Sequence, residues 1–307
     1  MICSICRKNE AFYFRVYEGV KFCKNCFKKS IEKKVRKTIL KYKMFERDDR
    51  IAVAVSGGKD SLTLLTILKK IESKFPSAEL LAFVIDEGIK GYRDEALKLT
   101  VEYCKALDIP LKIFSFKNFY GLTMDEIIAI DPLCFPCSYC GVLRRKAIDK
   151  AAKELNADKV ATAHNLDDET QTFLLNIFHG DIYRLIRSGP KLIDLENKFI
   201  PKVKPLCEIP EKEITIYAYI TNIKFQSIPC PYAHLALRND IRELLNKIEE
   251  KHPGVKFTVF NSMRKIKEAL EKHKVELNKC EVCGEPTPSN ICEACLMLKK
   301  LLAKSFA

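Results

Sequence analysis

Residues 51–62 read IAVAVSGGKDSL, an apolar run that leads into two adjacent glycines and then into polar residues. Glycine lets a backbone turn tightly and approach an anion closely, and the unpaired N–H groups at the start of a following helix attract negative charge. This arrangement predicts a phosphate-binding loop. Its candidate nucleotide ligands are Val55, Ser56, Gly57, Gly58, Lys59, Asp60 and Ser61.

The loop differs from the Walker A loop of enzymes that transfer a γ-phosphoryl group. In a Walker A loop, Ser or Thr directly follows the lysine and four residues separate the glycines. Here Asp60 follows Lys59, and the two glycines are adjacent. The sequence therefore disfavours γ-phosphoryl transfer.

Segment 137–145, which reads CSYCGVLRR, is a second candidate for chemistry. Cys137 and Cys140 lie one helical turn apart and precede Arg144 and Arg145, so one helix face could hold both sulfur and phosphate. Thiols beside arginines could also carry sulfur as a persulfide.

Segment 162–169 reads TAHNLDDE and lies between a predicted strand and a predicted helix. Ligands of open α/β sheets bind at the carboxyl edge of the strands, so this segment is expected near the glycine loop. The alternative is that Asp167 and Asp168 only complement the helix dipole and that His164 is a core histidine.

Eight cysteines form four C-x-x-C pairs near the two ends of the sequence. Four thiolates complete a tetrahedral zinc shell and leave no open position for chemistry, so two structural zinc sites in a reducing compartment are expected rather than disulfides. The zinc ligands would be Cys3, Cys6, Cys23 and Cys26 at one end, and Cys280, Cys283, Cys292 and Cys295 at the other. Cys104 and Cys134 are predicted to be buried filler, and Cys207 has no assigned role.

The segments between the cysteine pairs must position these residues. Short β-branched runs alternate with amphipathic stretches, which predicts a doubly wound α/β fold with a parallel sheet, flanked by two zinc modules. Strands are expected at 51–55, 80–85, 111–116 and 159–163, and helices at 61–73, 92–107, 139–155, 168–178, 211–221, 237–251 and 259–274. The predicted domains are a zinc module (1–30), a catalytic domain (31–236, with a basic linker helix at 31–48), a helical appendage (237–276) and a second zinc module (277–307).

The 53 Lys and Arg residues outnumber the 40 Asp and Glu residues and give a net charge of +13. Between residues 21 and 43, ten basic residues accompany a single acidic one, Glu32. This charge favours a polyanion such as nucleic acid, although a solvated helix without a partner fits it equally well. No apolar run is long enough to cross a membrane, so a cytoplasmic protein without a membrane partner is expected. The absence of Trp and the use of only two Gln are compatible with a thermophile source.

The run 56–61 resembles the PP-loop of the N-type ATP pyrophosphatases, which cleave ATP between its α and β phosphates and form adenylates. Segment 137–145 resembles the C-x-x-C-G-x-x-R-R motif of tRNA 2-thiolation enzymes, the TtuA family and the related cytoplasmic wobble-uridine thiolases. The resemblance covers nearly the entire chain, because zinc pairs, PP-loop, C-x-x-C-G, HN-x-DD, a downstream cysteine and zinc pairs follow in the family's order.

The resemblance implies a tRNA sulfurtransferase that adenylates the C2 oxygen of a uridine and replaces it with sulfur to give 2-thiouridine, at position 54 or alternatively at wobble position 34. It implies a [4Fe-4S] cluster held by Cys137, Cys140 and Cys230, with one iron open to bind sulfide. It assigns catalysis to these cysteines with Lys59, Asp60 and Asp168, and further ATP contacts to Phe83, Ile85, Arg145, His164 and Asn165. It also implies Mg²⁺, a ubiquitin-like sulfur carrier protein with a C-terminal thiocarboxylate, and a homodimer.

Three alternatives stay open. Sulfur could pass through a persulfide with no cluster. Another PP-loop ligase could adenylate a base or acid and add nitrogen, which would not require three thiols. A non-catalytic RNA-binding zinc protein would release no pyrophosphate from ATP and tRNA.

Overall fold

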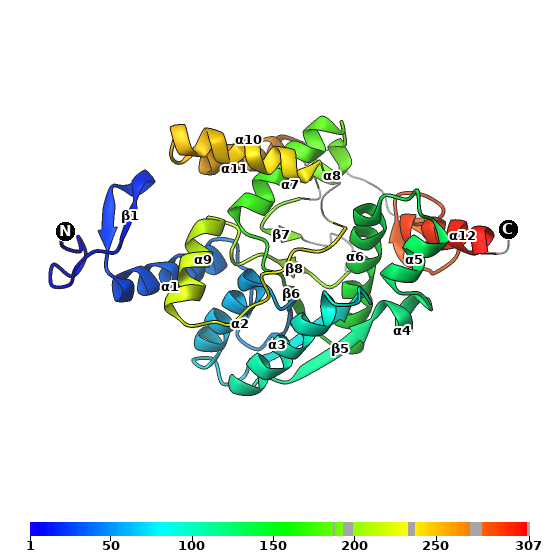
Figure 1. Ribbon diagram of the computed structural model, residues 1–307, viewed down its shortest axis with the longest axis horizontal. Helices are drawn as coiled ribbons and strands as arrows, with labels where there is room; N and C mark the ends of the chain where they lie inside the picture. The colour runs from blue at the N-terminus through cyan, green and yellow to red at the C-terminus, as the bar shows by residue number, and fades with distance from the viewer. Residues whose placement is uncertain (187, 193–198, 233–236, 271–277, 306–307) are drawn as a thin grey trace.

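A computed structural model describes residues 1–186, 188–192, 199–232, 237–270 and 278–305 of the chain. Its centre is a six-stranded sheet in the order β5-β4-β3-β6-β8-β7 (Figure 1). The strands are β3 (Arg50–Ala54), β4 (Glu79–Asp86), β5 (Leu111–Ser115), β6 (Lys159–Ala161), β7 (Lys191–Leu192) and β8 (Lys202–Val203). All neighbours pair in parallel except β7 and β8, which are antiparallel.

The chain winds outward in both directions from β3, and this confirms the doubly wound fold. From β3 it proceeds to β4 and β5 on one side, and then to β6 and β8 on the other. The direction reverses between β3 and β6, whose residues pair from Ile51 with Lys159 to Val53 with Ala161. In sheets of this kind, ligands bind beyond the carboxyl ends of the strands at such a reversal.

Alternate residues of β3 enter two separate hydrophobic cores, one on each face of the sheet. Ile51 and Val53 belong to the first core, and Ala52 belongs to the second. The first core includes residues of α1 (Lys24–Lys41), α2 (Lys59–Glu72), α3 (Arg93–Ala106) and α9 (Glu211–Ile220). The second includes residues of α4 (Phe116–Tyr120), α5 (Met124–Ile130), α6 (Pro136–Glu154) and α12 (Glu293–Ser305). Helices therefore cover both faces, as a buried parallel sheet requires.

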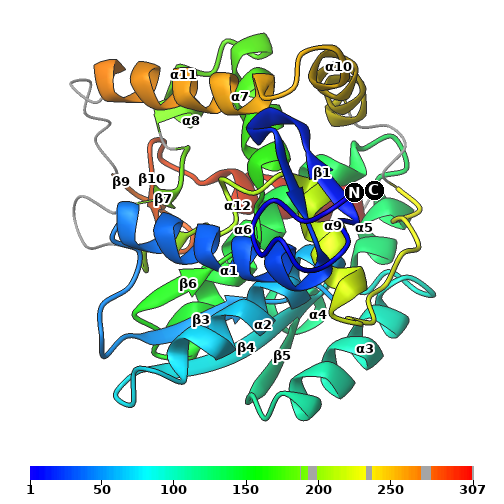
Figure 2. The same ribbon diagram turned by 90° about the vertical axis from the view of Figure 1, so that its left-hand side faces the viewer.

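A helical layer follows β6. Helices α10 (Arg238–Lys251) and α11 (Val255–Leu270) pack on α7 (Leu166–Phe178), beside the short α8 (Ile182–Ile186). Figures 1 and 2 both place α10 and α11 at the opposite end of the molecule from α3 and β5. Both helices lie within the predicted appendage (237–276), which stays a prediction as a domain, and its end at 276 falls outside the described residues.

The two cysteine-rich ends lie at opposite extremes of the longest axis (Figure 1). The first contains the hairpin of β1 (Tyr13–Arg15) and β2 (Val20–Phe22), joined by a 3-10 turn at Val16–Glu18. The second contains β9 (Asn278–Lys279) and β10 (Pro286–Thr287). None of the described helices is both long and apolar enough to pass through a bilayer.

Several predicted boundaries were wrong. The strands expected at 111–116 and 159–163 end at Ser115 and Ala161; after β5, the Ser115 side chain accepts a hydrogen bond from the Asn118 N–H at 3.0 Å and caps α4. The basic helix expected at 31–48 runs from Lys24 to Lys41, because Lys43 adopts φ +46° and ends the helical path. The helix expected from 259 begins at Val255, and its predicted end at 274 falls outside the described residues.

Candidate active site

The glycine loop connects β3 to α2. Gly57 adopts φ +82°, and a Cβ at this position would lie 2.7 Å from the carbonyl oxygen of Ala96 on α3, so no side chain fits there. Helix α2 starts directly after Gly58, and the Ser56 N–H donates to the Ser61 hydroxyl at 3.0 Å. The loop therefore places the unpaired amides of a helix start at the sheet edge, as an anion site requires.

Lys59 is held by two carboxylates. Its Nζ donates to Asp60 at 2.9 Å and to Glu211, the first residue of α9, at 2.7 Å. Burial lowers the pKa of Lys59, but the charges of Asp60 and Glu211 outweigh that effect and raise it above the ordinary value. The cation is therefore retained within the loop. Glu211 belongs to none of the predicted motifs, and only the folded chain brings it here.

The second acidic motif meets the glycine loop, as predicted. The Asn165 side chain caps α7, and Asn165 and Asp168 form a reciprocal capping box. The Asn165 amide also donates to Asp60 at 3.3 Å, which connects the segments that follow β6 and β3. Burial raises the pKa values of both Asp60 and Asp168. Asp168 thus has a structural role at the start of α7, and its carboxylate also faces the glycine loop.

His164 is exposed and is not a core histidine. Its Nδ1 lies 2.9 Å from the Thr162 hydroxyl. Desolvation by the surrounding protein, aided by the positive charge of Lys204, lowers the pKa of His164 to about 4. The ring is therefore neutral at pH 7 and can both donate and accept a hydrogen bond.

The cysteine motif lies in the first turns of α6. The exposed Cys137 thiol donates to the Tyr232 carbonyl at 3.6 Å, two residues after Cys230. Cys140 is partly buried, and its Sγ accepts a hydrogen bond from Nη2 of Arg144 at 3.1 Å. Burial raises the pKa of Cys140 to about 11, against the opposing charge of Arg144. The fold thus brings the downstream cysteine to the C-x-x-C turn.

Three charged side chains connect this turn to the glycine loop. Arg93 donates from Nη1 to the Ser56 carbonyl at 3.0 Å. Its Nε lies 2.8 Å from Oε2 of Glu87, and Oε1 of Glu87 lies 2.6 Å from Nε of Arg144. Arg144 in turn contacts Cys140. The loop and the thiols therefore belong to one site.

The four remaining residues predicted to contact the nucleotide differ in their exposure to solvent. Val55, Phe83 and Ile85 have buried side chains, and Phe83 and Ile85 lie in the second core. Arg145 is exposed, and its pKa is lowered by desolvation and by the nearby charges of Arg184, Arg144 and Arg238. Of these four residues, only Arg145 presents a side chain to solvent.

The other cysteines outside the C-x-x-C pairs are structural. Cys104 and Cys207 are buried in the first core, and desolvation raises the pKa of Cys207 well above its ordinary value. Cys134 is half-buried against the second core. The prediction for Cys104 is confirmed, and Cys207 is assigned to packing.

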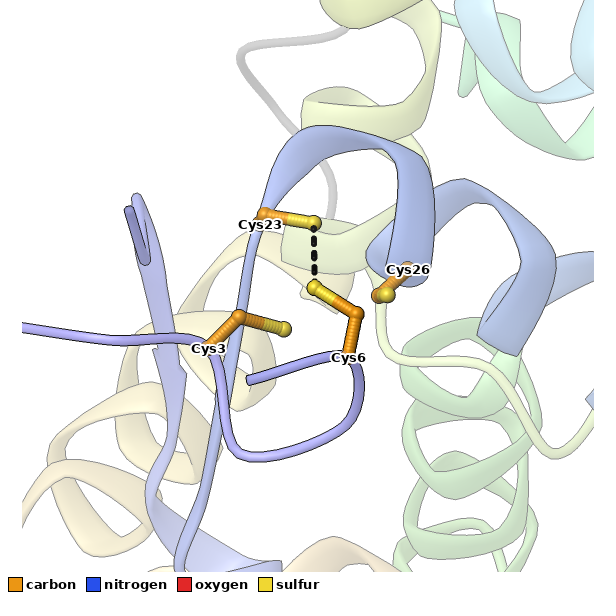
Figure 3. Close-up of side chains that lie close together, drawn as sticks. All are labelled: Cys3, Cys6, Cys23 and Cys26. Carbon is orange, nitrogen blue, oxygen red and sulfur yellow. Dashed lines mark hydrogen bonds between the residues drawn. The ribbon is translucent and has the colours of Figure 1, made fainter. Parts of the chain in front are cut away.

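The four sulfurs of the N-terminal group point toward one centre (Figure 3). Within each terminal group all four lie within 4.8 Å of one another, with Cys6 and Cys23 3.9 Å apart and Cys283 and Cys292 3.8 Å apart. A Zn–S bond of about 2.3 Å gives a tetrahedron whose edges, the distances between sulfurs, are about 3.8 Å. Each of the two groups therefore fits one zinc ion. At the C-terminal group, Lys146 also donates to Cys283 at 2.8 Å, which offsets thiolate charge.

Among the described residues, only these two groups bring three or more possible ligand atoms within 4.8 Å of one another. Cys137, Cys140 and Cys230 are therefore more widely spaced than the ligands of one ion. In a [4Fe-4S] cluster each thiolate would bind a different iron, so its ligands need not converge on one ion.

Comparison with known proteins agrees with this geometry. Residues 27–249 match the PP-loop domain family. The chain belongs to this family. Among PP-loop relatives, a probable sulfurtransferase of Methanocaldococcus jannaschii is 41% identical over 98% of this chain and 88% of its own length. The tRNA 2-thiolation protein NcsA of Haloferax volcanii is 36% identical over 99% of this chain and all of its own length.

A solved PP-loop structure matches nearly the whole molecule. It is the U34-tRNA thiolase NcsA from Methanococcus maripaludis with its [4Fe-4S] cluster, which is 34% identical and superposes with a TM-score of 0.86 over 98% of this chain and 96% of its own. The family expected from the motifs is therefore confirmed.

Proposed function

We propose that this protein is a tRNA sulfurtransferase that converts a uridine to 2-thiouridine with ATP as the activating substrate. The observation that carries this proposal is the continuity of the site: a loop built for phosphate and a partly buried thiol, Cys140, are connected by three side chains. An enzyme that activates an oxygen with ATP and then replaces it with sulfur requires both in one place. The relatives named as tRNA 2-thiolation proteins support the same chemistry.

In the first step, the uridine O2 attacks the α-phosphorus of ATP. The new O–P bond forms as the bond to the β-phosphate oxygen breaks, and pyrophosphate leaves with the electron pair. The loop amides and Lys59 stabilise the developing charge because they are fixed before the reaction. Asp60 and Asp168 are carboxylates facing the same site, and we assign the binding of Mg²⁺ to them.

In the second step, a sulfide sulfur attacks C2, the C2–O bond breaks, and AMP leaves. Cys137, Cys140 and Cys230 would hold a [4Fe-4S] cluster at this point, and such a group supplies an iron position that can carry sulfide. The chain itself contributes Arg144, whose positive charge lies beside Cys140 and stabilises anionic sulfur. Neutral His164 can hydrogen-bond to the base without adding a charge.

The resemblance favoured position 54, but a solved relative matched over nearly the whole chain is named as a thiolase of U34. We therefore propose position 34, with position 54 as the alternative. We assign zinc to the two terminal Cys₄ groups. A thiocarboxylate carrier protein as sulfur source, a homodimer and a cytoplasmic location remain predictions; a relative in Candida glabrata is named as cytoplasmic.

The decisive experiment has a cellular and a purified arm. In a strain lacking the gene, mass spectrometry of tRNA fragments should show loss of 2-thiouridine at position 34 and its retention at other positions. With purified chain, ATP and undermodified tRNA should release pyrophosphate, and adding sulfide should yield 2-thiouridine. Asp60→Ala should abolish both.

The outcomes separate the rivals. Loss at position 54 alone would reassign the target nucleotide. Ammonium incorporation in place of sulfide would identify a nitrogen-adding ligase. Unchanged tRNA together with no pyrophosphate release would identify a non-catalytic RNA-binding protein. Full activity in an iron-free preparation would exclude the cluster from the reaction.

A further inference from the structure

Glu87 is a buried carboxylate that none of the sequence motifs includes. It follows β4 directly and is only 2% exposed. Its backbone carbonyl accepts a hydrogen bond from the Met124 N–H at 2.8 Å, which fixes it against α5. A charge this deeply buried requires compensation, and here two arginines supply it.

The two arginines reach different parts of the site. Arg93, 4% exposed, also donates from Nη2 to the Ile85 carbonyl at 2.7 Å, so it connects the glycine loop to the end of β4. Arg144 is 46% exposed and reaches Cys140. The charges alternate from Arg93 (positive) through Glu87 (negative) to Arg144 (positive), and Arg144 donates a hydrogen bond to the Cys140 sulfur. Each charge is stabilised by its neighbours, so removing one affects the next.

The contact between Glu87 and Arg93 is close but not aligned. Oε2 of Glu87 and Nε of Arg93 are 2.8 Å apart, yet both are buried without a hydrogen-bond partner among the described residues. A small shift of Arg93 would complete this bond. Since Arg93 also holds the Ser56 carbonyl, phosphate binding at the loop is the event expected to produce such a shift.

We propose that Glu87 is a positioning residue that couples occupancy of the nucleotide loop to the environment of Cys140 through Arg93 and Arg144. The proposal rests on the function proposed above, in which Cys140 is one of the three thiols at the site of sulfur transfer. Coupling free energies are reciprocal, so a nucleotide that changes Cys140 is itself bound differently when Cys140 changes. The bridge formed by Arg93, Glu87 and Arg144 would thus coordinate activation of the uridine with readiness of the sulfur site.

The test measures how fast iodoacetamide alkylates Cys140 in the full-length chain purified without iron, with and without ATP and Mg²⁺. Mass spectrometry of the peptides follows Cys140, with Cys134 in the same digest as a reporter of general loosening. In the wild type, ATP should change the Cys140 rate by about fivefold or more, the lower range of usual couplings. The Cys134 rate should stay the same.

Two variants cut the bridge at different points. Glu87→Gln removes the central charge, and Arg144→Met removes a half-exposed side chain whose loss should leave the fold intact. In both, the rates with and without ATP should become equal within about twofold, a change too small to represent coupling. Lys153→Met is the matched control, because Lys153 lies on the same helix, is also 46% exposed, and pairs with Glu285 at 2.7 Å away from the bridge. It should retain the wild-type ratio.

Each outcome decides the matter. A wild-type ratio of one overturns the coupling. A ratio retained in Arg144→Met or Glu87→Gln also overturns it, since direct shielding of Cys140 by nucleotide would persist in both variants. The assay contains neither tRNA nor iron. Loss of 2-thiouridine formation in the experiments above and loss of coupling here are therefore independent failures.

Discussion

Lys59 is held in place as a cation at the glycine loop before any phosphate binds. Without nucleotide, its ammonium group is shared by Asp60 and Glu211, at 2.9 and 2.7 Å. Both carboxylates keep it charged and localised, which avoids the entropy loss of ordering a free lysine when ATP arrives. In the proposed mechanism, the same residue then stabilises the leaving pyrophosphate.

Replacing Lys59 with Met should slow tRNA-dependent pyrophosphate release by about 100- to 1000-fold, as expected when one preorganised donor to a developing charge is lost. Single-turnover release of labelled pyrophosphate measures this. Lys69→Met is the control, because Lys69 lies later in α2 and, among the described residues, donates only to the Asp108 carbonyl at 3.4 Å. Equal rates in both variants would remove Lys59 from the mechanism.

At the level of single residues, the sequence predicted those site residues that lie within short contiguous motifs. The loop, the Asn165 motif and the C-x-x-C turn are contiguous strings, and the fold brings them together as expected. Glu87 and Glu211 lie outside such strings. Glu211 contacts Lys59, and Glu87 contacts Arg93 and Arg144, but no local sequence pattern distinguishes either residue from a surface carboxylate.

Among the helices, α9 connects the N-terminal module to the active site. Its first residue, Glu211, contacts Lys59. Two residues later, Glu213 forms a buried pair with Arg15 of β1, with both side chains 1% exposed and the Nε–Oε1 distance 2.7 Å. The Tyr17 hydroxyl also donates to Glu213 at 2.7 Å. The N-terminal module is thus anchored next to the glycine loop.

Glu213→Gln should lower the free energy of unfolding by about 3 kcal/mol, the lower end for breaking a buried pair, because Arg15 then keeps only the partly exposed Glu18 as an anionic partner among the described residues. Urea denaturation measures the change. Glu208→Gln serves as the control: Glu208 pairs with the exposed Lys41, and such surface pairs contribute below about 1 kcal/mol. A loss below 1 kcal/mol for both would show that the buried pair does not anchor the module.

Helix α1 presents a lysine stripe to solvent. Lys29, Lys33 and Lys37 are exposed at four-residue spacing, while Phe27 and Ile31 of the same helix are buried. This pattern fits a face that follows an RNA backbone.

The double variant Lys33→Ala and Lys37→Ala should weaken tRNA binding about fivefold or more and lower the slope of log affinity against log salt by about two, one unit for each lost phosphate contact. Filter binding at several salt concentrations measures both quantities. Removing the exposed Lys247 and Lys251 of α10 is the matched control. An equal loss in that control would mean that net charge alone attracts the RNA.

The elements that were missed from sequence are short or depend on tertiary contacts. Strands β7 and β8 have two residues each, too few for any periodicity to show. Helices α4 and α8 have five residues, and α5 depends on its Thr123–Glu126 capping box. By contrast, long amphipathic segments such as α2 and α6 were predicted to within three residues.

For the whole molecule, the two cysteine-rich modules lie at opposite ends, and between them lie α2 and α6, whose first turns carry the glycine loop and the C-x-x-C turn (Figure 1). Most residues of the two cores belong to the central domain, so it should remain folded when one module is lost. Cys6→Ser should reduce bound zinc from two ions to one per chain and weaken tRNA binding, while ATP binding persists.

Elemental analysis, filter binding and calorimetry measure these three quantities. Cys104→Ser, which alters a buried thiol of the first core, should keep both zinc ions. Unchanged zinc content in Cys6→Ser would exclude the N-terminal zinc site.

The overall architecture was predictable because alternating strands and helices permit few topologies. The position of the modules at the two extremes was not, because it depends on contacts such as Arg15 with Glu213 and Lys304 with Asp131. Those pairs connect residues nearly 200 and more than 170 positions apart.

Gly57 rests against the Ala96 carbonyl, so the loop cannot retreat from an incoming triphosphate. A binding site that is rigid before its ligand arrives discriminates by shape. Tripolyphosphate should therefore bind to the loop, while bulkier polyanions of equal charge should bind weakly or not at all. Selection among cellular anions would then begin with backbone stiffness, ahead of any recognition of adenine.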